Sequence, residues 1–186
     1  FLGGKEYKWK NQSDADMKSY ELRPWRLSDC RSLAEYADNI RVWNNLRDGF
    51  PSPYTEEDAR EYIESTLSKG CVQDFAIVID GKAIGGIGFI PQSDVERYSA
   101  EIGYWLGEPY WGQGIMSGIV FRFVEYIFTT TELVRLYASV FDYNTASRRV
   151  LEKCGFRLVG IMRKAVRKND RWADMCCYEM LKSSEK

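Results

Sequence analysis

The sequence of 186 residues contains no histidine. This absence excludes catalytic pairs that need an imidazole, such as Ser-His and Cys-His, and it excludes histidine-ligated zinc or haem. Any general base must therefore be a carboxylate, Tyr, Cys, Lys or an ordered water molecule. We expect no metal site.

Other features are scarce as well. The five cysteines are odd in number and form no C-x-x-C pair, which argues against a disulfide framework or zinc ribbon and favours a reducing compartment. Basic and acidic residues nearly balance, at 26 and 27, so direct nucleic-acid binding through charge alone is not expected. No apolar run approaches the roughly 20 residues of a membrane helix, and no signal-peptide core is present. We expect a cytoplasmic protein that does not enter membranes.

The composition that remains is that of a folded domain. Hydrophobic residues make up 45% of the chain and charged residues 28%, values typical of globular proteins. Aromatic residues, at 15%, supply large side chains for a core. Residues 1–16 are mostly polar and irregular, so we expect a tag remnant or loose extension there. The length then suits a single domain over residues 17–186.

Hydrophobic periodicity and turn residues predict a mixed order of strands and helices. Thr55 to Asp58 has the pattern of a capping box, and Asp80-Gly81 between two β-branched runs is typical of a tight hairpin. The expected elements are a strand over 20–25, helices over 29–38 and 40–46, a helix from Thr55, strands over 75–79, 83–90 and 98–106, a helix over 112–129, a strand over 133–141, a helix over 144–154, and two strands from Phe156 and from Trp172.

The segment from Trp111 to Gly114 joins a strand to the longest of these helices. Glycine at 112 and 114 permits unusual backbone angles and leaves no side chain over the N–H groups of the helix start. Such N–H groups, with the positive end of the helix dipole behind them, are typical of phosphate sites. The P-loop and Rossmann fingerprints are both absent. The simpler alternative is a helix start with two turn glycines.

A second motif follows in Asn144 to Phe156. Together the two motifs resemble those of the GNAT N-acetyltransferase superfamily, and within it the RimJ/RimL-type branch. The family pattern [RQ]-x-x-G-x-[GA] falls on residues 111–116, and N-x-x-[SA]-x-x-[VL]-x-E-K-x-G-F falls on 144–156. The resemblance implies a three-layer α+β fold. Its central sheet would be mixed and mostly antiparallel, with about six to seven strands, a splay between the fourth and fifth strands, and helices on both faces.

The resemblance also implies acetyl-CoA as the acyl donor. Its pantetheine arm would enter the splay and pair with backbone near Trp105, Leu106 and Gly107. Asn144 would touch this arm and Ser147 would lie near the sulfur, although both side chains could equally cap the helix that follows. The predicted cofactor-binding residues are Trp105, Leu106, Gly107, Trp111, Gly112, Gln113, Gly114, Ile115, Met116, Ser117, Asn144 and Ser147.

Two positions depart from the family pattern. Trp111 stands where Arg or Gln is usual, and Met116 stands where Gly or Ala is usual. Because backbone N–H groups hold the phosphates, we expect these changes to alter affinity rather than abolish the site. They leave a non-catalytic acyl-CoA-binding module of the same fold as the alternative function.

The leading interpretation is an acetyl-CoA-dependent N-acetyltransferase in which a primary amine attacks directly. Glu101 is the first candidate for the general base, because strand alternation puts it on the same face as Gly103 and Trp105. The alternative is a structural carboxylate that pairs with a cation or caps the sheet edge. Ser147 is the candidate donor to the leaving thiolate. Cys154 is better explained as a core residue. The other candidate bases are Asp94, Glu96 and Asp174, of which the last is expected to be structural.

The sequence does not specify the acceptor amine. A protein N-terminus, such as that of a ribosomal protein, and a small-molecule amine are both open. Six basic residues against one acid lie between Arg157 and Arg171, which indicates a solvated strand face. The alternative is a surface for an acidic substrate, or for nucleic acid beside a ribosomal target. Trp43, Phe50 and Tyr54 are expected in the core rather than against the substrate. We expect a monomer, or a homodimer formed through an exposed strand edge.

Overall fold

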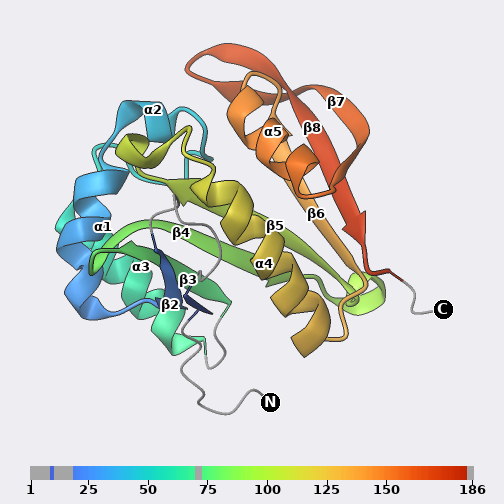
Figure 1. Cartoon of the computed structure of the whole chain (residues 1–186). Helices are drawn as coiled ribbons and strands as arrows, with labels where there is room; N and C mark the ends of the chain where they lie inside the picture. The colour runs from blue at the N-terminus through green and yellow to red at the C-terminus, as the bar shows by residue number, and fades with distance from the viewer. Residues whose placement is uncertain (1–8, 11–18, 70–72, 184–186) are drawn as a thin grey trace. The chain divides into compact units, whose positions relative to one another are not determined.

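The computed structural model describes residues 9–10, 19–69 and 73–183 (Figure 1). The chain forms two compact units. The first contains residues up to 88 together with 104–113, and the second contains 89–103 together with 114–186. Two strands, β4 (Lys82–Pro91) and β5 (Ser99–Leu106), contain residues of both units. No helix in the described ranges combines the length and the apolar character that crossing a membrane requires.

The first unit is built on antiparallel strands. β2 pairs with β1 on one side and with β3 on the other, and β3 pairs with β4. The β3–β4 turn has Asp80 at φ 49° and Gly81 at φ 77°, the two positive values of a type I′ turn, so the predicted hairpin is confirmed. The strands are β1 (Trp9–Lys10), β2 (Glu21–Pro24), β3 (Asp74–Ile79) and β4 (Lys82–Pro91).

Helices pack on this sheet around a core that contains Trp25 and Ile63. The predicted capping box is confirmed, because the Thr55 side chain accepts from the Asp58 N–H and Asp58 accepts from the Thr55 N–H. Asn39 caps the short helix α2 in a similar way. The helical elements are η1 (Leu27–Asp29), α1 (Cys30–Ala37), α2 (Ile40–Trp43) and α3 (Glu56–Ser68).

The carboxyl end of β5 (Ser99–Leu106) lies very close to β4. A Cβ atom at Gly85 of β4 would stand only 2.5 Å from the carbonyl oxygen of Trp105, so glycine is required there. The Gly107 N–H donates to the carbonyl of Ile84 at 2.7 Å. A short helix, η3 (Glu108–Tyr110), follows, while η2 (Asp94–Glu96) precedes β5 in the second unit.

The strands of the second unit run in the order β5-β6-β8-β7. β6 pairs antiparallel with β8 along its whole length, from Arg135 to Phe141. Its pairing with β5 is parallel and covers only three residue pairs, the last of which is Glu101 with Tyr137. β5 and β6 correspond to the fourth and fifth strands predicted from sequence, so the predicted splay is confirmed. The further strands are β6 (Arg135–Phe141), β7 (Arg157–Lys168) and β8 (Arg171–Leu181).

Two helices complete this unit, α4 (Ile115–Thr130) and α5 (Thr145–Lys153). α4 begins three residues later than predicted, because Gly112 and Gly114 both have positive φ and cannot continue a right-handed helix. Gly155 ends α5 with φ 90°, as its sequence position indicated. The buried face of α4 is formed by Ile115, Met116, Ile119, Val120, Phe123, Val124, Tyr126 and Ile127.

The predicted fold class is thus confirmed as a mixed, mostly antiparallel sheet flanked by helices. The described residues contain eight strands rather than six to seven. The additional strand is β1, in the segment that the sequence assigned to an extension. Its residues Trp9 and Lys10 pair with Leu22 and Glu21. The remainder of residues 1–16 lies outside the described residues.

Candidate active site

The turn before α4 has the geometry of an anion site. Gly112 has φ 73° and Gly114 has φ 75°, and a Cβ atom added at either position would meet nothing within 4 Å. The first backbone hydrogen bond of α4 runs from the Gly118 N–H to the Gly114 carbonyl, at 3.2 Å, and no side chain caps Gly114. The N–H groups of Ile115 to Ser117 therefore lie ahead of the helical ladder, with the positive end of the dipole behind them. Open space and aligned donors together suit a phosphate.

Two side chains fix this turn from within. The indole N–H of Trp111 donates to the carbonyl of Leu106 at 2.6 Å, and the side-chain amide of Gln113 donates to the carbonyl of Pro109 at 2.8 Å. The first bond joins the turn to the last residue of β5, and the second joins it to η3. Trp111, which departs from the family pattern, thus holds the backbone of the turn in place.

The three predicted backbone contacts at the end of β5 are not equivalent. Because the Gly107 N–H points to β4, alternation directs the backbone groups of Leu106 to the opposite edge of the strand. The side chain of Trp105 packs over Gly86 and against Phe50, with 5.9 Å between the Trp105 and Phe50 ring centroids. Of the three residues, Leu106 is therefore the one whose N–H faces away from β4.

Asn144 caps α5. Its Oδ1 accepts from the Ser147 N–H at 3.1 Å, so the capping interpretation of Asn144 is confirmed. The side-chain amide nitrogen of Asn144 is not used in this bond. Ser147 stands in the first turn of α5 and is half-buried.

The end of α5 contacts the beginning of α4. Cys154 is buried, as predicted, and its Sγ donates to the carbonyl of Ser117 at 3.2 Å. Burial raises the pKa of this thiol above its ordinary value. At neutral pH Cys154 is therefore a neutral packing residue rather than a thiolate nucleophile.

A buried tyrosine that sequence analysis missed joins α5 to β8. The Tyr178 hydroxyl donates to Glu152 at 2.8 Å and accepts from Arg148 at 3.1 Å. Burial is the main cause of the raised pKa of Tyr178. The i, i+4 spacing of Arg148 and Glu152 was visible in the sequence, but nothing local indicated their shared partner on β8. Of these two residues, Glu152 stands at a specified position of the downstream motif, whereas Arg148 stands at an unspecified one.

Glu101 lies at the last paired position of β5 and β6, opposite Tyr137. It is half-buried, whereas its neighbours Ala100 and Ile102 are buried on the other face. On β6, the Arg135 guanidinium stands 4.9 Å from the centre of the Tyr137 ring. The candidate base therefore sits where the ladder ends, beside an aromatic side chain that sequence analysis did not single out.

The other candidate bases have different surroundings. The Asp174 carboxylate accepts from the Lys164 N–H at 2.8 Å, and its own N–H donates to Asp142 at 3.3 Å. Lys164 has φ 51°, so the regular backbone of β7 is interrupted there, and the hydrogen bond from its N–H to Asp174 stabilises this irregularity. These contacts agree with the structural role expected of Asp174. Asp94 and Glu96 are exposed in η2. In the ranges that the structure describes, no three Cys, Asp or Glu side chains are placed to hold a metal ion.

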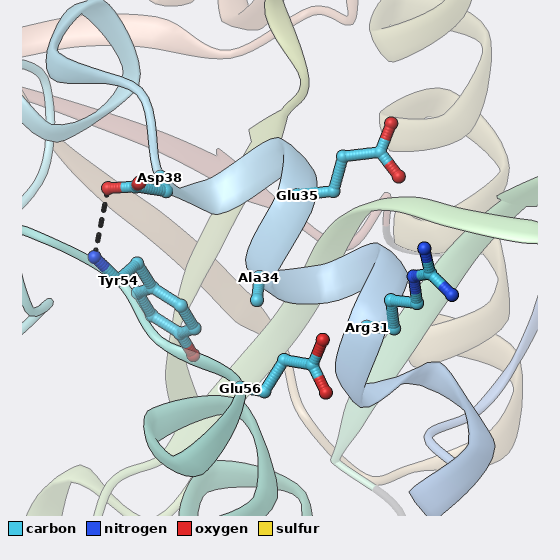
Figure 2. Close-up of a pocket in the computed structure, with 6 residues that line it drawn as sticks. All are labelled: Arg31, Ala34, Glu35, Asp38, Tyr54 and Glu56. Carbon is cyan, nitrogen blue, oxygen red and sulfur yellow. Dashed lines mark hydrogen bonds between the residues drawn. The ribbon is translucent and has the colours of Figure 1, made fainter.

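A pocket of about 440 Å³ opens beside α1 in the first unit (Figure 2). Tyr54 is buried, as predicted, and its N–H donates to Asp38 at 3.0 Å. Phe50 packs against Tyr54, with 4.7 Å between ring centroids, while Trp43 is half-buried and donates its indole N–H to the Phe50 carbonyl. None of the predicted donor-binding or catalytic residues lines this pocket. Its lining consists of Arg31, Ala34, Glu35, Asp38, Tyr54 and Glu56.

The basic run on β7 and β8 is mainly a solvated face. Arg167 pairs with Asp170 at 3.0 Å and lies over the ring of Trp172. Lys168 is the exception, because it is buried. The other basic residues of the run are exposed: Arg157, Arg163, Lys164 and Arg171.

Comparisons with known proteins agree with this arrangement. The model of the acetyltransferase (GNAT) domain family matches residues 20–157. An uncharacterized N-acetyltransferase p20 from Bacillus licheniformis is 32% identical over 87% of this chain and 92% of its own length. The ribosomal-protein-serine acetyltransferase of Escherichia coli is 30% identical over 90% of this chain and 96% of its own length.

Solved structures share the fold. RimJ of Mycobacterium smegmatis, in complex with CoA-disulfide, has 23% identity and a TM-score of 0.78, over 88% of this chain and 82% of its own. The glycine turn, the splayed strands and the capped α5 therefore belong to a fold that is known from solved structures. The chain belongs to the GNAT acetyltransferase family, in its RimJ/RimL-type branch, and is an N-acetyltransferase.

Proposed function

We propose that this chain transfers the acetyl group of acetyl-CoA to the α-amino group of a protein N-terminus. The observation that carries the donor assignment is the glycine turn, which has open space at Gly112 and Gly114 and no side-chain cap for the N–H groups of Ile115 to Ser117. A CoA compound is bound in the structure of RimJ, which has the same fold. The N–H of Leu106, which points away from β4, is the backbone group suited to an amide of the pantetheine arm.

The acceptor assignment is supported by the relatives. The Escherichia coli relative that aligns over 90% of this chain is named for acetylating serine in ribosomal proteins. A spermidine N(1)-acetyltransferase from the same organism aligns with 24% identity over 76% of this chain. A polyamine is therefore the alternative acceptor that the test must compare with a protein N-terminus. A ribosomal acceptor fits the cytoplasmic location that we propose. The family model spans residues of both units, which supports our proposal of a single domain over 17–186.

Glu101 is proposed as the general base. It removes a proton from the attacking ammonium, directly or through water, so that a neutral amine can attack the thioester carbon. The carbon–nitrogen bond forms as the carbon–sulfur bond breaks. The proposed step is direct, and the buried Cys154 thiol, whose pKa is raised by burial, is not proposed as an acyl acceptor.

Ser147 is proposed as the donor to the departing sulfur. Its position in the first turn of α5 adds the favourable end of a helix dipole to a hydroxyl hydrogen bond. Asn144, which caps the same turn, uses its Oδ1 for the cap, so its side-chain N–H groups are the ones proposed to bind the donor arm. A negative charge that develops on sulfur would be stabilised mainly in the transition state.

The test is a release assay for the CoA thiol with acetyl-CoA and three acceptors: ribosomal-protein N-terminal peptides, spermidine and an aminoglycoside. We expect turnover with peptides, and a mass increase of one acetyl group on the peptide α-amine. Peptides blocked at the α-amine but containing lysine are the matched control. Turnover with spermidine alone would overturn the acceptor assignment, and no turnover with any amine would overturn the proposed reaction.

Two variants test the roles. Ser147→Ala should lower kcat about tenfold with little change in donor affinity, because its contribution belongs to the transition state. Glu101→Gln should lower kcat and remove the acidic limb of the pH–rate profile. If the acidic limb persists in a folded Glu101→Gln protein, the base is another group.

A further inference from the structure

The predicted phosphate segment contains no positive side chain. From Gly107 to Ser117 there is no Lys or Arg, and the one charged residue is Glu108. The backbone N–H groups contribute only partial charges, whereas the phosphates of CoA are full anions. A carboxylate at the start of the segment would repel them unless a cation neutralises it.

That cation comes from α2. One carboxylate oxygen of Glu108 accepts from the Asn39 side-chain amide at 2.8 Å, and the other accepts from the Arg41 guanidinium. Asn39 also caps α2 by accepting from the Arg41 N–H at 2.8 Å. The carboxylate is thus held at both oxygens, and Arg41 is fixed beside it.

Arg41 also lies over the indole that begins the glycine turn. Its guanidinium carbon is 5.7 Å from the centre of the Trp111 ring, within the range of a cation–π contact. The indole is itself fixed, because its N–H is bonded to the Leu106 carbonyl. Arg41 therefore has a defined place at Trp111, the position where the family pattern has Arg or Gln.

These contacts do not use all the N–H donors of the Arg41 guanidinium. The Arg41 side chain is 67% exposed, against 30% for that of Glu108. Within the described part of the chain, Glu108 is the only acceptor recorded for the guanidinium, through one of its nitrogens. Since a guanidinium has five N–H donors in a plane, several remain for a second anion.

We infer that Arg41 is a phosphate-binding residue for the acyl-CoA donor, supplying from α2 the cation that the glycine turn lacks at Trp111. This inference rests on the proposed function, since it needs a CoA thioester as the substrate. Arg41 is placed beside the turn by α2 and by its contact with the Trp111 ring, and the charge of Glu108 weakens its attraction for phosphate.

A purely structural role makes a different prediction. If Arg41 only tied α2 to η3, removal of either partner of the ion pair would disturb the turn in the same way. If Arg41 binds phosphate, loss of Arg41 and loss of the Glu108 charge should act in opposite directions. Glu108→Gln keeps an acceptor for Asn39 while it removes the repelling charge.

The experiment measures dissociation constants by calorimetry for CoA, dephospho-CoA and pantetheine. We expect Arg41→Gln to weaken CoA binding about tenfold or more, Arg41→Lys to retain most of the affinity, and Glu108→Gln to bind CoA as tightly as wild type or more tightly. Pantetheine, which has no phosphate, should bind all variants equally. Arg31→Gln, which removes an exposed arginine of α1, is the charge-matched control and should have no effect.

The ligands separate the outcomes. A loss in Arg41→Gln for both CoA and dephospho-CoA assigns the contact to the pyrophosphate, and a loss for CoA alone assigns it to the 3′-phosphate. Unchanged affinity for both, or equal weakening by Arg41→Gln and Glu108→Gln, would overturn the inference. Failure of the wild-type protein to bind CoA would instead overturn the proposed function. Thermal unfolding of each variant confirms that it is folded.

Discussion

The thiol of Cys154, at the end of α5, donates a hydrogen bond to the backbone carbonyl of Ser117 in the first turn of α4. This contact ties the capped helix of the downstream motif to the helix that begins at the glycine turn. Cys154→Ala removes the bond and some packing, so we expect a loss of about 1 kcal/mol in the free energy of unfolding. Acetyl transfer should persist with kcat nearly unchanged. Abolished turnover in a folded variant, or an acetyl-cysteine detected by mass spectrometry, would contradict direct attack.

The raised pKa of Cys154 predicts its reactivity with pH. Only the thiolate is alkylated rapidly, so a higher pKa moves labelling to higher pH. Between about pH 7 and about pH 9 we expect the half-buried Cys177 to react with iodoacetamide well before Cys154. Peptide mapping after timed labelling measures both rates. In denaturant the two rates should converge, and a difference that persists there would mean that burial is not the cause.

Gly114 tests the backbone of the turn. Space is open around it, but its φ of 75° is unfavourable for a residue with a Cβ atom. Gly114→Ala should therefore lower the free energy of unfolding by about 1–2 kcal/mol and weaken CoA binding, without any steric clash. Gly160→Ala is the matched control, because Gly160 also has open space but no positive φ. Equal effects of the two changes in chemical denaturation would refute this explanation.

Asn144 allows capping to be separated from donor binding. Asn144→Ala should cost about 1 kcal/mol of stability through loss of the cap. Asn144→Asp retains the acceptor for the Ser147 N–H, so its stability should remain near that of wild type. The same change removes the side-chain N–H donor, so KM for acetyl-CoA should rise. A normal KM in Asn144→Asp would leave Asn144 with the capping role alone.

Local patterns predicted the elements well where neighbouring residues decide the structure. The capping box at Thr55 and the turn at Asp80-Gly81 each depend on a few consecutive residues, and both are present. The start of α4 was placed too early, because periodicity does not report the sign of φ at Gly112 and Gly114.

Contacts between distant segments were not predictable in this way. The Asn39 and Arg41 contacts with Glu108 and the hydroxyl of Tyr178 between Arg148 and Glu152 join segments that lie far apart in the sequence. No local pattern marks such pairs, because each partner is an ordinary polar residue within its own element. The sequence therefore indicated the loop that we propose as the donor site, but not the side chains of other elements that support that loop.

A buried ion pair connects β2 to η1. The Arg23 guanidinium makes two hydrogen bonds of 2.7 Å to the Asp29 carboxylate, which also accepts from the Arg26 N–H. Asp29→Asn leaves an uncompensated buried charge, so we expect a loss of about 3–5 kcal/mol in the free energy of unfolding. The double variant Arg23→Met/Asp29→Asn removes both charges and keeps the acceptor for Arg26. It should be more stable than Asp29→Asn alone in urea denaturation; additive losses would show that the charges are independent.

The short parallel ladder between β5 and β6 has a consequence for the order of folding. The hairpins β3–β4 and β7–β8 are closed by tight turns, whereas the ladder that ends at Glu101 and Tyr137 has the whole of α4 between its two strands. Closing that longer loop costs more chain entropy, so these three residue pairs should form late, after the rate-limiting step. A ligand seated where the ladder ends would stabilise contacts that the folding transition state lacks. The bound ligand should therefore slow unfolding and leave the refolding rate nearly unchanged. Ligand-bound protein should then survive proteolysis for longer than ligand-free protein.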